Sequence, residues 1–255
     1  MDLKASVADV TGLAIEGGST LLVNAIDALP AFSDTALSIE NGNLTLNKNL
    51  KTAITTITVK SGILTVPDGG YIGNGSDSTP DSTVELKAEG QLVLGKELTL
   101  RELETAEGSA IDTNGKTLSV AKLQDDKLNA AVTGNLQLVP AADLTATLKK
   151  KVEGEITVNA KNDAKVTLDA QDDVDRIEFQ AVMGANPASA TLKLAAGKRI
   201  KTLVFGKGNP FRAELAGNNE VDSLFLHSTN PLTVKSPPEN SGFTASILSI
   251  YLCVQ

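Results

Sequence analysis

The sequence contains one group of carboxylates whose types and spacing suggest chemistry. Asp172, Asp173, Asp175 and Glu178 all lie within residues 172–178. Two carboxylic acids that flank a glycosidic bond are the usual machinery of polysaccharide cleavage. In a coiled chain, the two catalytic carboxylates would come from adjacent turns and lie far apart in sequence. The segment 172–178 is the candidate source of one of them. Without such a partner, the four residues form a solvated corner of the fold.

A second motif, Arg199-Ile200-Lys201, follows the carboxylates. It is similar to the Arg-Ile-Lys tripeptide of the polygalacturonases, which place a basic residue near paired aspartates. The Asn-Thr-Asp and Gly-His-Gly motifs of that family do not occur in the sequence. Because a tripeptide matches readily by chance, and because Ile200 also belongs to the repeat described below, the motif does not by itself predict an enzyme.

The remaining reactive residue types are isolated. His227 is the single histidine, and nucleophilic catalysis needs a base and an orienting group together with the nucleophile. Cys253 is the single cysteine and lies in an apolar tail, which is typical of a buried small residue. The segment 73–77 (GNGSD) is similar to half of a glycine-rich calcium repeat, but such sites need several stacked copies. The sequence therefore predicts no catalytic, cofactor-binding or metal-binding residue.

The composition indicates a layered aliphatic core. Hydrophobic residues make up 41% of the 255 residues, whereas aromatic residues make up 3% and tryptophan is absent. Thin side chains such as Val, Leu and Ile stack well on strands. The net charge of −8 disfavours binding to a phosphate backbone, so nucleic acid is not an expected partner.

A repeat of 21 residues is visible toward the C-terminus, where four apolar positions recur at this spacing. The equivalent pairs are Leu194 and Leu215, Ile200 and Val221, Leu203 and Leu224, and Phe205 and Leu226. A third copy of the pattern precedes the first by 26 residues, at Leu168, Val174, Ile177 and Phe179. We expect each set of equivalent residues to stack along a shared interior, with Leu203 above or below Leu224 and Lys201 facing outward.

Glycines mark turns between short alternating apolar segments in the first half of the chain. They are Gly42, Gly62, Gly90, Gly115 and Gly134, at steps of 20, 28, 25 and 19 residues. Each unit would be two strands joined by a turn that needs positive φ, and such a unit buries its apolar face only by stacking on its neighbours. The sequence therefore predicts an all-β fold, a parallel β-helix or β-solenoid of about ten irregular rungs of 19–28 residues.

The predicted solenoid is a single domain over residues 1–255. Two segments interrupt the pattern, 24–34 and 141–152, and either a loop or a short helix fits each of them. The apolar tail 244–255 is expected to cap the last coil. A leucine-rich repeat is the second possible fold, although Leu226 is separated from Asn230 by three residues where that repeat has two.

The repeated arrangement of strand, glycine or asparagine turn and strand is found over 37–46, 54–66 and 200–215. With few cysteines, few aromatics and a pI near 4.8, it resembles the passenger regions of bacterial autotransporters and related right-handed β-helix surface proteins. The resemblance implies export across an outer membrane and a role in adhesion, host interaction or display.

We therefore expect a non-catalytic binding or adhesion module at a bacterial surface, as a fragment of a larger exported protein. Its expected partner is a host or matrix protein or a glycan, and it would meet a membrane only through an anchor outside this segment. Residues 1–4 show no basic region followed by an apolar core, so either a mature fragment or an intracellular protein is indicated. The alternative function is a polysaccharide-active β-helix enzyme, a lyase or a glycoside hydrolase, with carboxylates on adjacent rungs.

Overall fold

The fold is an all-β parallel β-solenoid, as the repeat predicts. The computed structural model describes residues 2–3, 14–15, 20–23, 36–46, 55–68, 72, 80–160, 164–181, 189–206, 211–215, 219–227, 232–235 and 245–253. Within these ranges the only helical element is a single 3₁₀ turn, η1 (Gln124–Asp126), and no helix is long and apolar enough to cross a membrane.

The chain forms two compact units. Unit 1 contains residues 1–125 and 129–134, and unit 2 contains residues 126–128 and 135–255. A strand, β13 (Ala131–Leu138), has residues in both units.

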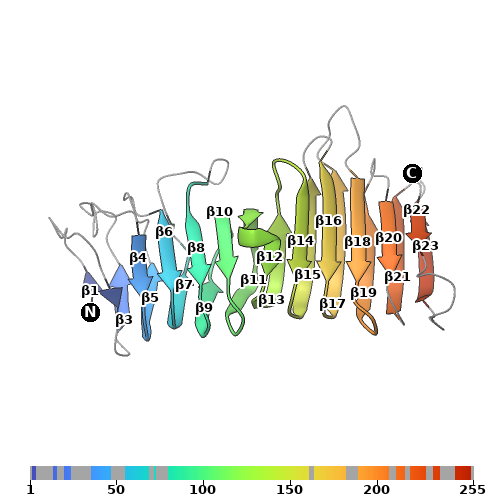
Figure 1. Ribbon diagram of the computed structural model, residues 1–255. Helices are drawn as coiled ribbons and strands as arrows, with labels where there is room; N and C mark the ends of the chain where they lie inside the picture. Colours follow the sequence, from blue (N-terminus) through green and yellow to red (C-terminus); the bar gives the residue numbers. More distant parts are fainter. Residues whose placement is uncertain are drawn as a thin grey trace. The chain divides into compact units, whose positions relative to one another are not determined.

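Unit 1 is built from strands that pair in parallel with the strand after next. One ladder has the order β1, β3, β5, β7, β9 and the start of β11, and the other has the order β2, β4, β6, β8, β10 and the end of β11. Figure 1 shows β4, β6 and β8 side by side. The strands are β1 (Asp2–Leu3), β2 (Ala14–Ile15), β3 (Thr20–Val23), β4 (Ala36–Ile39), β5 (Gly42–Leu46), β6 (Thr56–Val59), β7 (Gly62–Val66), β8 (Thr83–Leu86), β9 (Gly90–Leu94), β10 (Leu98–Thr105) and β11 (Ala110–Leu123).

Unit 2 also places two strands in each turn. One ladder has the order β12, β14, β16, β18, β20 and β22, and the other contains β15, β17, β19, β21 and β23 (Figure 1). The strands are β12 (Lys127–Leu128), β14 (Leu144–Leu148), β15 (Val152–Ala160), β16 (Lys165–Ala170), β17 (Val174–Ala181), β18 (Ser189–Leu194), β19 (Arg199–Phe205), β20 (Phe211–Leu215), β21 (Asn219–His227), β22 (Leu232–Lys235) and β23 (Ala245–Cys253). Two strands per turn disagree with the leucine-rich repeat, which supplies one strand per repeat.

The interior of unit 2 consists of ladders of equivalent apolar side chains. Leu203 pairs with Leu224 in the register of β19 and β21, and the two residues are 3% and 1% exposed. The rings of Phe179 and Phe205 stack at 5.4 Å between centroids with 11° between their planes. Both rings are buried, so the aromatic pair continues the ladder. The predicted stacking of Leu203 on Leu224 is confirmed.

The spacing of the earlier repeat copy is correct on one strand and wrong on the other. Val174 pairs with Ile200, which preserves the predicted 26-residue step. Leu168, however, pairs with Leu192, and Leu194 instead pairs with Ala170. Three residues separate Ala170 from Val174, whereas five separate Leu194 from Ile200, so the turn before β17 is two residues shorter than the turn before β19. Ala170 is small but fully buried and takes the place that the apolar pattern assigned to Leu168.

Close backbone packing explains the first three glycines of the predicted series. Gly42 pairs with Gly62, and Gly62 pairs with Gly90, on adjacent strands. Gly62 has a φ of +98°, and a Cβ built on it would lie 1.9 Å from the carbonyl oxygen of Gly42. Gly115 does not continue this column, because Ala110 pairs with Gln91 and Gly115 lies further along β11. Its φ is +74°, and a Cβ there would meet nothing within 4 Å.

The expected interruption at 141–152 is wrong. Leu144, Ala146 and Leu148 are buried and alternate with threonines, which gives strand β14 in parallel register with β16. The period of two therefore determines the structure here, although Asp143 could cap a helix and the lysines at 149–151 are typical of a helix end. Residues 24–34 lie outside the described residues. Of the tail 244–255, residues 245–253 form β23, which pairs along the edge of β21.

Candidate functional site

The acidic segment 172–178 lies in unit 2, in the turn between β16 and β17 and on the first half of β17. Val174 and Ile177 point into the core and are 1% and 0% exposed. Because neighbouring residues of a strand point to opposite faces, Asp175 and Glu178 point outward. Asp172 and Asp173 precede the strand and are partly exposed. The fold therefore gathers the four carboxylates on the outer surface.

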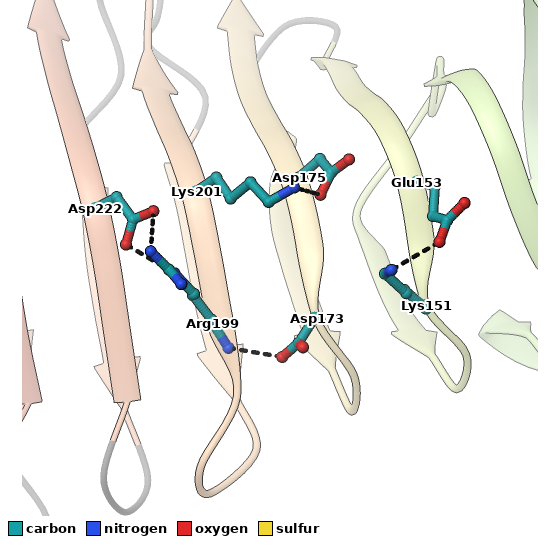
Figure 2. Close-up of polar contacts among 7 residues, drawn as sticks. All are labelled: Lys151, Glu153, Asp173, Asp175, Arg199, Lys201 and Asp222. Carbon is teal, nitrogen blue, oxygen red and sulfur yellow. Dashed lines mark hydrogen bonds and ion pairs between the residues drawn. The ribbon is translucent and has the colours of Figure 1, made fainter.

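Three of these carboxylates are bound by the next rung. Lys198 Nζ lies 2.8 Å from Asp172 Oδ1, and the backbone N–H of Arg199 donates to Asp173 Oδ1 at 2.9 Å. Lys201 Nζ lies 2.7 Å from Asp175 Oδ1. Figure 2 shows the last two contacts between neighbouring strands.

The fourth carboxylate is held by side chains of its own strand. Glu178 lies 2.5 Å from Arg176 Nη2 and accepts a hydrogen bond of 2.6 Å from Gln180 Nε2. Arg176 Nε also lies 3.1 Å from Glu155 Oε2 on β15. Thr157 donates to Glu155 at 2.9 Å. These five side chains form one connected polar network on the outer face of β15 and β17.

Arg199-Ile200-Lys201 is explained by the same arrangement. Ile200 is fully buried in the ladder of Val174 and Val221. The side chain of Arg199 points outward and donates to Asp222 through Nε at 2.9 Å and Nη2 at 2.7 Å. Its partner belongs to the rung on the other side of β19 (Figure 2). The tripeptide thus supplies one core residue and two cations that bind the neighbouring rungs.

The electrostatics of this site favour the ionised form of Asp172. The hydrogen bond from Lys198 lowers the pKa of Asp172 below its ordinary value, with further help from the N–H of Asp173 and against the effect of partial burial. The same hydrogen bond raises the pKa of Lys198. A carboxylic acid that protonates a leaving group near neutral pH needs a raised pKa instead. The lowered pKa keeps Asp172 ionised as the partner of the Lys198 ammonium group.

The Asp172 to Lys198 pair makes a testable contribution to stability. Because the pKa of Asp172 is lower in the folded chain than its unfolded value of about 3.9, the pair stabilises the fold above that pH and loses its effect as pH falls through the folded pKa. With both side chains about one-third exposed, we expect Asp172→Asn to lower the free energy of unfolding by less than about 1 kcal/mol at neutral pH. In urea titrations, the difference between the wild type and the variant should shrink as pH falls through the folded pKa of Asp172. A difference that stays constant as the pH is lowered would contradict the assignment.

Unit 1 carries a smaller network of the same kind. Lys87 lies between the carboxylates of Glu85, at 3.4 Å, and Glu104. The hydrogen bond with Glu104 is the main cause of the raised pKa of Lys87, and Glu85 contributes less. Thr58 donates to Glu85 at 3.0 Å from the preceding strand of the ladder. Pairing between rungs is thus found in both units.

The other sequence candidates are placed as follows. His227 pairs with Cys253 in the backbone register of β21 and β23. The segment 73–77 lies outside the described residues. Among the residues that the structure describes, no group of three or more His, Cys, Asp or Glu side chains is arranged to hold a metal ion.

Sequence reasoning found the carboxylates of this site and missed most of their partners. The motifs in the sequence give no sign of three of these partners. Stacking of neighbouring rungs brings Lys198 and Asp222 to their partners, and Arg176 contacts Glu178 on its own strand. The signal that would have found Lys198 is the 26-residue offset of the repeat, which separates Asp172 from Lys198. The chain matches no protein-family model, no curated protein and no solved structure.

Proposed function

We propose that the chain is a non-catalytic binding or adhesion module of an exported bacterial protein, displayed at the cell surface or secreted. The observation that carries this proposal is the pairing of the acidic segment. Asp172 and Asp175 lie 2.8 and 2.7 Å from lysines, and Glu178 lies 2.5 Å from an arginine. Carboxylates held in this way stabilise and shape a surface.

The parallel ladders give such a module a regular outer face. Each rung repeats its outward positions at about 4.8 Å along a ladder. In the first ladder of unit 2, for example, Thr145, Thr167 and Thr191 are in register and outside the core. Binding on such a face depends on many modest contacts in place of a deep pocket. The partner class that we propose is a host or matrix protein or a glycan, and the finer proposal is an autotransporter passenger.

The alternative is a polysaccharide lyase or glycoside hydrolase, and one experiment separates the two classes. The chain is incubated with a panel of acidic and neutral polysaccharides while reducing ends and unsaturated sugar products are measured. In parallel, its retention on immobilised glycans and matrix proteins is recorded. We expect retention on at least one surface and no product above the buffer control.

The paired variants Asp175→Asn and Asp68→Asn make the test specific. Asp175 belongs to the acidic segment, whereas Asp68 is an exposed residue of unit 1. Cleavage that disappears in Asp175→Asn and survives in Asp68→Asn would show that the enzyme alternative is correct. Failure of the chain to bind any of the immobilised surfaces would count against the binding module.

A further inference from the structure

The apolar ladder of unit 2 does not by itself define which rung lies next to which. Three successive rungs carry the same inward pattern, with Ile177, Leu203 and Leu224 in one column and Phe179, Phe205 and Leu226 in another. A rung could exchange its neighbour for the one beyond it and still bury apolar side chains. Something other than the core must distinguish the correct neighbour.

The outward charges alternate in sign from rung to rung. We define the first acidic rung as residues 165–181 (β16 and β17), the basic rung as 189–205 (β18 and β19) and the second acidic rung as 211–227 (β20 and β21). The first acidic rung has five acidic and two basic residues, a net charge of −3. The basic rung has four basic residues and no acidic one. The second acidic rung has three acidic residues and one basic residue, a net charge of −2 with His227 neutral.

The basic rung contacts both acidic neighbours through these charges. Toward the first acidic rung, Lys198 and Lys201 lie 2.8 and 2.7 Å from carboxylate oxygens. Toward the second, Arg199 makes its two hydrogen bonds to Asp222 and lies 3.7 Å from Glu220. In the other ladder, Lys193 pairs in register with Asp169 on one side and with Glu214 on the other. Opposite charges therefore contact each other on both sides of β19, and residues of opposite charge are in register on both sides of Lys193.

We propose that this alternation determines the stacking order of unit 2. If the second acidic rung stacked directly on the first, Asp169 would be in register with Glu214, Asp173 with Glu220, and Asp175 with Asp222. Like charges on directly opposite strand positions are destabilising, whereas opposite charges are stabilising. The same rule disfavours stacking of one acidic rung on its copy in a second molecule. This inference is independent of the proposed binding function.

Cysteine cross-linking during refolding can test the stacking order. Thr167, Thr191 and Arg212 are consecutive in one outward column. In the native order, Thr191→Cys and Arg212→Cys are one strand spacing apart, about 4.8 Å, which a disulfide can bridge. Thr167→Cys and Arg212→Cys are two spacings apart, about 10 Å, which exceeds the disulfide limit of about 7 Å. A disulfide of the second pair therefore reports a skipped rung.

The experiment uses the whole chain with Cys253→Ser, refolded with oxidised and reduced glutathione. With the native charges, we expect the 191–212 disulfide in most monomers and the 167–212 disulfide in almost none. A charge-reversed variant, called the reversed chain, has Glu in place of Lys193, Lys198, Arg199 and Lys201. In this variant the fraction of monomers with the 167–212 disulfide should rise at least severalfold. In the neutral control the same four positions are changed to Gln, and the rise should be clearly smaller.

A rescue variant separates mis-stacking from a general failure to fold. It combines the four Glu substitutions with Asp169→Lys, Asp172→Lys and Asp175→Lys, which reverse the first acidic rung, and with Glu214→Lys and Asp222→Lys in the second. We expect this variant to return to the 191–212 disulfide. The proposal is overturned if the reversed and neutral chains give equal amounts of the 167–212 disulfide, or if the rescue variant does not recover the native one.

Discussion

Replacing Leu203 by aspartate is expected to lower the free energy of unfolding by about 4–5 kcal/mol. The side chain is 3% exposed and stacks between Ile177 and Leu224 in the ladder. The variant would lose the apolar burial of a leucine and would place an unpaired carboxylate in a column that contains only aliphatic groups. Urea denaturation followed by far-UV circular dichroism would measure the loss.

Lys201→Asp is the matched control, two residues away on the same strand. Its side chain is 62% exposed and ends in the ion pair with Asp175. Losing an exposed pair and gaining a like-charge neighbour should lower the free energy of unfolding by about 1 kcal/mol or less. Equal losses in the two variants would mean that the inward and outward phase of β19 is assigned incorrectly.

Gly62→Ala is the second substitution with a large expected effect, a loss of about 3–4 kcal/mol in the stability of unit 1. An alanine at a φ of +98° is strained, and its Cβ would lie 1.9 Å from the carbonyl oxygen of Gly42. Backbone atoms of a paired strand cannot move away without opening the ladder between β5 and β7. The loss should appear as a lower urea midpoint and as faster hydrogen exchange in these two strands.

Gly115→Ala separates the two causes. Gly115 also has a positive φ, +74°, but its Cβ would meet no atom within 4 Å. Only the conformational strain remains, which costs about 1–2 kcal/mol. If Gly62→Ala were no worse than Gly115→Ala, the close approach of Gly42 would have no energetic importance.

The period-two pattern was enough to predict the solenoid, because buried aliphatic side chains recur at fixed offsets wherever strands stack. The 21-residue offset therefore predicts the strand partners of Ile200, Leu203 and Phe205 correctly from the sequence. The position of Leu168 was not predictable in this way. Turns of different length shift one ladder relative to the other, and a small residue such as Ala170 can fill a buried place that a hydrophobic pattern ignores.

The polar part of the site was harder to predict for a related reason. A carboxylate in a sequence carries no sign of its partner when that partner lies one rung away. Asp172 and Lys198 are 26 residues apart, and Arg199 and Asp222 are 23 apart. Such ion pairs can be predicted only when the strand register is known. A register error of two residues, such as the one at Leu168, assigns a wrong partner to every charged residue of the strand. The loop or short helix that seemed possible at 141–152 is a strand, because Asp143 and the lysines at 149–151 are only local signals, whereas Ala146 is buried in the ladder.

The unequal lengths of the turns before β17 and β19 indicate where the protein tolerates insertions. Two more residues fit between Leu194 and Ile200 than between Ala170 and Val174, yet Val174 and Ile200 remain in register. Chain length at this corner is therefore uncoupled from the core. A foreign peptide inserted at residues 195–197 would project from the surface while the strands on either side keep their partners. The turn at 195–197 is therefore a site where the surface loop can be replaced or lengthened while the buried ladders stay unchanged.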